Sequence, residues 1–216
     1  MNGYVDLGFS YQKANKTVQL STGARVVYRG RTTETAFDLS TFLEDRDDAS
    51  ETSRLSSSLT GRLLFSNRWS AGVVLGYDNN EELDLSGRER IVGFATRTLA
   101  QTNHLEFRAT GGLVGTRERY FSSDSTTYGM EGLIGAAFRA FRYDRPKLDA
   151  SIATSVYPSF TVGGRVRMQN DLRVSYELLS DFMLTMTLFD AFDSKPQSAG
   201  APKNDFGTTL GVSWTF

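Results

Sequence analysis

A strict alternation of apolar and polar residues is the feature of this chain that most restricts its fold. It is clearest from Arg165 to Leu178, where one face carries Val166, Met168, Leu172, Val174, Tyr176 and Leu178. The opposite face carries Arg165, Arg167, Gln169, Asp171, Arg173, Ser175 and Glu177. Because a period of two places alternate side chains on opposite faces of a β-strand, this segment is predicted to be a strand. Its two faces must meet very different surroundings.

The same alternation recurs along the whole chain and predicts about twelve strands, an even number, as single-chain bacterial barrels have. The expected spans are 3–13, 18–30, 33–44, 53–65, 69–79, 84–97, 104–116, 126–140, 147–158, 165–178, 183–192 and 205–216. Each is at or above the roughly 9–11 residues with which a tilted strand crosses a bilayer. No linker or helical periodicity interrupts them. We therefore expect one domain over residues 1–216, an all-β, closed, antiparallel transmembrane β-barrel.

The composition fits this fold and excludes several others. Mean hydropathy is -0.32 and no apolar run approaches the roughly 18 residues of a membrane helix, but a barrel exposes only alternate residues to lipid. There is no Cys, so disulfides and thiolate metal sites are excluded, and a formal net charge of -1 gives no reason to expect nucleic acid. No metal or phosphate-loop pattern occurs, so no cofactor is expected. Met1 leads directly into a strand-like segment, as in a mature chain without its signal peptide.

The segment from Phe206 to Phe216 keeps the alternation up to the last residue. It resembles the C-terminal strand of bacterial outer-membrane β-barrels, which closes the barrel and is read by the insertion machinery. The resemblance implies that an insertion signal is formed by Leu210, Val212, Trp214 and Phe216. The partners it implies are outer-membrane lipid, lipopolysaccharide and the barrel-insertion machinery.

The connections between the predicted strands differ in length. Gly30-Arg31-Thr32 and Ser66-Asn67-Arg68 are tight turns, whereas residues 44–52, 117–125 and 193–204 form longer polar segments. Outer-membrane barrels have short periplasmic turns and longer external loops. Both termini are then expected on the periplasmic side.

Four segments carry the closest resemblance to a known family. They are LTMTLFDAFDSKP (184–196), KNDFGTTLGVSWTF (203–216), SVYPSF (155–160) and NNEELDLSGRERIVGFA (79–95). They are similar to the last hairpin and the middle region of the salt-induced outer membrane protein family, a domain family of unknown function. This resemblance implies an outer-membrane barrel without an established activity and without catalytic residues. Glu89 and Arg97 fall on the apolar face of the sixth span, where a bulge or strand end is expected.

If the apolar face meets lipid, the polar face must line the barrel interior. The predicted lumen-lining acids are Asp6, Glu34, Asp38, Asp78, Asp84, Glu106, Glu131, Asp149, Asp171 and Glu177. The predicted lumen-lining bases are Arg25, Arg29, Arg54, Arg62, Arg88, Arg90, Arg108, Arg139, Arg165, Arg167 and Arg173. Arg and carboxylates are nearly balanced, and Arg forms planar bidentate pairs with carboxylates. A two-residue turn at Arg31 and Thr32 would place Arg29 opposite Glu34 and Arg25 opposite Asp38. Any open space is expected along the small inward residues of the last strand, from Gly207 to Thr215.

Three classes of function follow from such a lumen. The first is a narrow passive channel for small polar solutes or ions, of weak ion selectivity. The second is a plugged barrel whose charges only brace the wall. The third is an outer-membrane hydrolase, for which the single histidine, His104, next to Glu106, is the one candidate base, although a lone His is more often a strand-end polar residue. A soluble β-sandwich and a lipocalin-like barrel fit less well, because the charges and the strand number exceed what those folds use.

Overall fold

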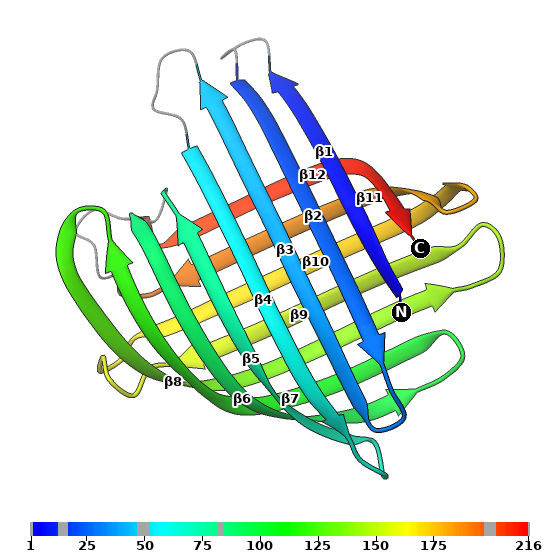
Figure 1. The fold of residues 1–216 in the computed structure, drawn as a ribbon, viewed down its shortest axis with the longest axis horizontal. Coiled ribbons are helices and arrows are strands. Elements are labelled where there is room, and N and C mark those ends of the chain that lie inside the picture. Colours follow the sequence, from blue (N-terminus) through cyan, green and yellow to red (C-terminus); the bar gives the residue numbers. More distant parts are fainter. Residues whose placement is uncertain (1, 13–16, 47–51, 82–83, 197–201, 216) are drawn as a thin grey trace.

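The chain folds into a closed, antiparallel barrel of twelve strands (Figure 1). The computed structural model describes residues 2–12, 17–46, 52–81, 84–196 and 202–215. The strands are β1 (Asn2–Gln12), β2 (Thr17–Arg29), β3 (Thr33–Arg46), β4 (Thr52–Leu64), β5 (Trp69–Asn80), β6 (Leu85–Gln101), β7 (Leu105–Tyr120), β8 (Ser123–Arg142), β9 (Leu148–Pro158), β10 (Val166–Leu179), β11 (Phe182–Asp193) and β12 (Asn204–Thr215). Each strand pairs with the next along the chain. The barrel closes where β1 pairs with β12, from Tyr4 opposite Thr215 to Gly8 opposite Gly211. The predicted fold class is therefore confirmed.

Apolar side chains lie on the outside of this barrel. The most exposed include Leu7, Ile134, Phe206 and Leu210, each with at least 60% of its surface accessible. By contrast, the buried apolar residues are only Ala36, Leu85, Val92, Val114 and Met183 among the described residues. Such an inside-out distribution requires an apolar solvent around the wall. Nowhere in the described ranges is there a helix long and apolar enough to span a bilayer.

The two ends of the barrel have different connections. At one end, called here the turn end, strands are joined by residues 30–32, 65–68, 102–104, 143–147 and 180–181. Asn67, Arg68 and Asp181 adopt positive φ angles in these tight turns. Because Tyr4 lies opposite Thr215, the two ends of the described chain also meet at the turn end (Figure 1). The opposite end is called the loop end.

One predicted loop is wrong. Residues 117–125 were expected to form a long polar connection, but β7 continues to Tyr120 and β8 begins at Ser123, so only Phe121 and Ser122 turn the chain. The polar residues there continue the period of two, with Glu118 and Tyr120 facing inward and Arg117 and Arg119 facing outward. A polar outward face therefore marks the edge of the lipid-facing apolar belt, and the strand itself extends beyond that edge. Of the other two predicted loops, residues 47–51 and 197–201 lie outside the described residues.

Glu89 and Arg97 do face outward on β6, and register shifts flank them. The pairing of β6 with β7 shifts between Leu85 and Gly87 and again between Thr98 and Ala100. The Arg97 guanidinium lies 5.4 Å from the centre of the Trp69 ring. Both charges therefore lie near strand ends, as expected, where they avoid the middle of the apolar belt.

Candidate functional site: the barrel lumen

The inward faces are identified by contacts between strands that are not neighbours in the sheet. Arg173 on β10 donates from Nη2 to Asp6 Oδ1 on β1 at 3.0 Å and to Ser213 Oγ on β12 at 3.3 Å. Its guanidinium lies 4.2 Å from the centre of the Tyr4 ring. Since β11 and β12 separate β10 from β1 along the wall, the Arg173–Asp6 pair must pass through the interior.

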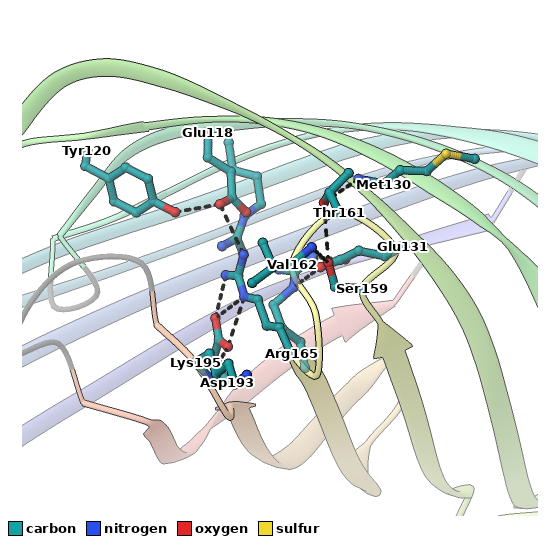
Figure 2. Close-up of polar contacts among 12 residues, drawn as sticks. Glu118, Tyr120, Met130, Glu131, Ser159, Thr161, Val162, Arg165, Asp193 and Lys195 are labelled. Atoms are coloured by element: carbon teal, nitrogen blue, oxygen red, sulfur yellow. Dashed lines mark hydrogen bonds and ion pairs between the residues drawn. The ribbon is translucent and has the colours of Figure 1, made fainter.

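At the loop end, Glu118 is the centre of a buried cluster (Figure 2). Its carboxylate accepts hydrogen bonds from Arg88 Nε at 2.7 Å and from the Tyr120 hydroxyl at 2.5 Å, and lies 3.9 Å from Arg165 Nη1. Arg165 in turn donates to both oxygens of Asp193 on β11, from Nε at 3.1 Å. Glu118 is only 2% exposed and Arg165 only 5%. Charges so far from water need these partners, because an unpaired buried charge is very costly.

The backbone of residues 159–165 helps to place Arg165. Ser159 N donates to the Arg165 carbonyl at 2.9 Å, and Val162 N donates to Ser159 Oγ at 3.0 Å. The turn at Gly164 has a φ of 71°, which glycine adopts without the usual Cβ penalty. A tight connection thus aims the Arg165 guanidinium back toward Glu118 (Figure 2).

Opposite walls of the barrel meet near the loop end. Asp205 on β12 lies 3.1 Å from Arg54 Nη1 on β4 and 3.3 Å from Asn80 Nδ2 on β5. The Arg54 guanidinium also stacks 4.1 Å from the centre of the Phe189 ring on β11. Because four strands separate β12 from β5 by the shorter way around the wall, these contacts narrow the lumen at this level. We call Arg54, Asn80, Phe189 and Asp205 the constriction.

The ion pairs toward the turn end are more accessible. Arg25 and Asp38 are joined at 2.6 Å, yet their side chains are 41% and 33% exposed. Arg139 donates from Nε to Asp149 at 2.8 Å, again with both side chains partly accessible. Side chains thus cross the lumen at the constriction near the loop end, whereas these two ion pairs nearer the turn end keep partly accessible side chains.

The predicted pairing across the turn at Arg31 and Thr32, between β2 and β3, is confirmed. Arg29 lies opposite Glu34 and Arg25 opposite Asp38 in the register of β2 and β3. The Arg25–Asp38 pair is close, whereas Arg29 lies 3.9 Å from Glu34, which is nearer to Arg62 on β4, at 3.3 Å. Glu34 on β3 therefore interacts with both neighbouring strands, β2 and β4, and not with its hairpin partner alone.

Most of the other predicted lumen charges also form ion pairs. Arg108 lies 3.1 Å from Glu106, Glu177 lies 3.6 Å from Lys147, and Arg167 donates from Nε to Glu131 at 2.9 Å. Asp171 differs from them. It faces inward on β10, is solvent-exposed, and accepts a hydrogen bond from Gln169 at 3.0 Å. Among the inward carboxylates whose side chains the structure describes, it is the one without an ion pair.

Asp84 was predicted on the lumen wall, and this is wrong. It lies in the connection between β5 and β6 with a φ of 57°, and its carboxylate accepts a hydrogen bond from Ser122 N at 3.1 Å. It thus links two loop-end connections. Asn and Asp tolerate this left-handed conformation better than other residues, which suits Asp84 to a turn.

Three lumen carboxylates were missing from the predicted set: Glu118, Asp193 and Asp205. All three lie near strand ends: Glu118 and Asp193 fall in segments expected to be loops, and Asp205 falls directly beside one. The period of two could have predicted them. Glu118 lies an even number of residues after the inward-facing Glu106 and Arg108, and Asp205 lies two residues before the inward-facing Gly207.

The expected open space along β12 is also wrong. Ser213 is fully buried, and a Cβ on Gly207 would lie 2.5 Å from the Phe189 ring. The small inward residues of β12 leave room that Arg173 and Phe189 fill. On the outward face of β12, Leu210, Val212 and Trp214 are exposed, and Phe216 lies outside the described residues.

The remaining candidate chemistry is sparse. His104 is exposed in the turn between β6 and β7, where its amide nitrogen donates to Thr102 Oγ1 at 3.2 Å. In the part of the chain that the structure describes, no three His, Cys, Asp or Glu side chains are grouped as a metal site. The lumen is therefore the candidate functional site.

Comparison with known proteins agrees with this architecture. A family model described as "Protein of unknown function, DUF481" matches residues 5–216. The NanC porin is similar over 100% of this chain and 99% of its own, with a TM-score of 0.54 and 9% identity. The KdgM porin (99% of each chain, TM-score 0.53, 8% identity) and an outer membrane channel from Pseudomonas putida F1 (100% and 94%, TM-score 0.53, 12% identity) are also similar. No curated protein sequence matches. At these identities the likeness establishes the fold, which is that of outer-membrane porins and channels and supports an outer-membrane location.

Proposed function

The chain belongs to the DUF481 family of proteins of unknown function, and from the geometry of its lumen we propose that it is a narrow passive channel of the bacterial outer membrane. Its cargo is small polar solutes or ions. The observation that carries the proposal is accessible charge inside a closed wall: Arg25 and Asp38 face inward with side chains 41% and 33% exposed, and the inward Asp171 is exposed. A lumen completely filled by packed side chains would bury them, as in the smallest barrels.

The constriction limits what can pass. Asp205 holds both Arg54 and Asn80 within hydrogen-bond or ion-pair distance, so the free cross-section there is small. Such a passage suits hydrated ions and small solutes and not folded or bulky molecules. The similarity of the fold to porins and to an outer membrane channel supports passive transport as the class of function. The oligogalacturonate present in one KdgM complex is not carried over, because this lumen is nearly balanced in charge.

Asp171 gives the proposed channel a weak cation preference. The other inward carboxylates of the described residues form ion pairs with Arg or Lys, whereas Asp171 accepts a hydrogen bond from Gln169 and has no ion pair within contact distance. A carboxylate in a low-dielectric wall raises the local cation concentration. The preference should weaken with added salt, because mobile ions screen an exposed charge.

Planar-bilayer recording of the purified, folded chain tests this function. We expect small discrete conductance steps, and larger steps for Asp205→Ala, which releases Arg54 and Asn80 from the constriction. Glu106→Gln, a change far from the constriction, should leave the step size unchanged. Silence of both the natural chain and Asp205→Ala, with folding confirmed, would refute the channel.

A second candidate is a braced barrel that conducts nothing. It is favoured by the nearly complete burial of Glu118, Glu131 and Arg165 and by the cross-wall contacts of Asp205. The same recording decides between the two, because only a channel gives steps whose size responds to the constriction.

A further inference from the structure

A row of polar side chains crosses the outer surface of four strands near the loop end. Tyr77 on β5 lies opposite Glu89 on β6, Glu89 lies opposite Arg117 on β7, and Arg117 lies opposite Tyr128 on β8. All four face outward, away from the lumen. This set, together with Arg119 on β7, is called the outer rim cluster.

The next row toward the turn end is apolar. It consists of Leu75, Ile91, Gly115 and Met130, in the same strand order and in direct register. Leu75, Ile91 and Met130 are each about half exposed, as lipid-facing side chains are. The outer rim cluster therefore lies where the apolar belt ends, at the depth of lipid headgroups. Tyrosine is enriched at this depth, because its ring is apolar and its hydroxyl is polar.

Two arginines share one carboxylate in this cluster. Arg117 Nη1 lies 3.4 Å from Glu89 Oε2, and Arg119 Nη2 lies 3.1 Å from Glu89 Oε1. All three side chains are between 44% and 47% exposed. Each guanidinium donates one N–H group to Glu89 and has further N–H donors that can bind a ligand. The cluster has a net positive charge, and Glu89 holds its two cations side by side.

Gly87 gives the cluster a small recess. A Cβ at this position would lie 3.3 Å from the Tyr77 hydroxyl and 3.5 Å from Arg119 Nη2. The phenol and the guanidinium therefore both extend over Gly87. On the other side of the cluster Tyr128 is 69% exposed.

We propose that the outer rim cluster binds a phosphate group carried by a glycolipid of the outer leaflet. Planar guanidinium groups match the oxygens of a phosphate, and the position at the edge of the apolar belt lets acyl chains lie against Leu75, Ile91 and Met130. The loop end faces the outer leaflet if the short turns are periplasmic, as in other outer-membrane barrels. This site is independent of whether the lumen conducts.

Binding of lipid A to the purified barrel in neutral detergent tests the proposal. Native mass spectrometry would measure the affinity for diphosphorylated lipid A, for lipid A with its phosphates removed and for phosphatidylglycerol. The test variant is Arg117→Gln/Arg119→Gln. The matched control, Arg29→Gln/Arg145→Gln, removes the same charge from exposed side chains at the turn end.

We expect the test variant to bind diphosphorylated lipid A about tenfold more weakly than the natural chain, because each Arg near an anionic surface adds to the attraction. The control should bind as the natural chain does, and removal of the lipid phosphates should abolish the difference. Equal weakening in both variants would overturn the site, since it would reflect total charge. Competition by inorganic phosphate at lipid concentrations, or equal affinity for phosphatidylglycerol, would overturn the assignment to a glycolipid.

Discussion

Replacement of Glu118 by Gln should strongly destabilise the barrel. Glu118 lies in the loop-end cluster with its side chain only 3% exposed, and its carboxylate faces the guanidinium groups of Arg88 at 2.7 Å and Arg165 at 3.9 Å. Gln keeps the shape of the side chain but removes the negative charge. Arg88 then loses its ion-pair partner while it stays mostly buried. Removal of one partner of a buried pair costs about 3–5 kcal/mol, and we expect a loss of that size.

Glu106→Gln is the matched control. It removes the same group from an inward-facing pair near the turn end, where Arg108 is 31% exposed and water can replace the lost carboxylate. Accessible pairs contribute about 0–1 kcal/mol, so the control should lose little.

Urea unfolding of both variants in lipid vesicles measures the difference. Trp69 and Trp214, the two tryptophans of the chain, both lie on the outer surface and report on contact with lipid through their fluorescence. The unfolding midpoints at a constant denaturant slope give the change in free energy of unfolding. Equal losses in the two variants would refute the reasoning, because the cost would then not depend on burial.

Three further changes have distinct expected results. Gly112→Ala should lower the folded yield, because its Cβ would lie 2.3 Å from the Gly93 carbonyl oxygen. A Cβ at Gly93 meets nothing within 4 Å, so Gly93→Ala should fold normally. The folded fraction of both variants is measured by gel migration without boiling. Leu113→Arg should reduce the free energy of unfolding by about 2–4 kcal/mol, since it places a charge in the apolar belt, and urea titration measures the loss. Asp171→Asn should move the reversal potential in a salt gradient toward zero, and an unchanged potential would exclude Asp171 as the source of cation preference.

The alternation of residue types predicted the twelve strands and which face of each points inward, although not every strand end. Arg25 and Asp38 are an example: the alternation predicts that both point inward, and the two-residue turn between β2 and β3 predicts their register. Such pairs are local, because they depend only on neighbouring strands and the turn between them.

Contacts across the lumen could not be predicted in this way. Arg54 and Asp205 lie on strands far apart in the chain, and their approach depends on the shape of the barrel and the tilt of its strands. Period-two patterns carry no information on either quantity. The prediction of the end of β7 was wrong for another reason. Strand ends were predicted where the outward face loses its apolar residues, but Arg117 and Arg119 make the outward face of β7 polar before the strand ends.

The small inward side chains of β12 are covered by large side chains of other strands. Small side chains on β12 suggested an opening, but large side chains of other strands occupy the room they leave. Arg173 reaches Ser213 and Asp6, and Phe189 covers Gly207 while Arg54 stacks on its ring. A run of small inward residues on one strand therefore does not by itself indicate an opening, because large side chains of nearby strands such as β10 and β11 can cover it. Accessible space is then expected beside charged side chains that do not reach across the lumen. Arg25 and Asp38, which pair between neighbouring strands, and Asp171, which has no ion pair, are such side chains.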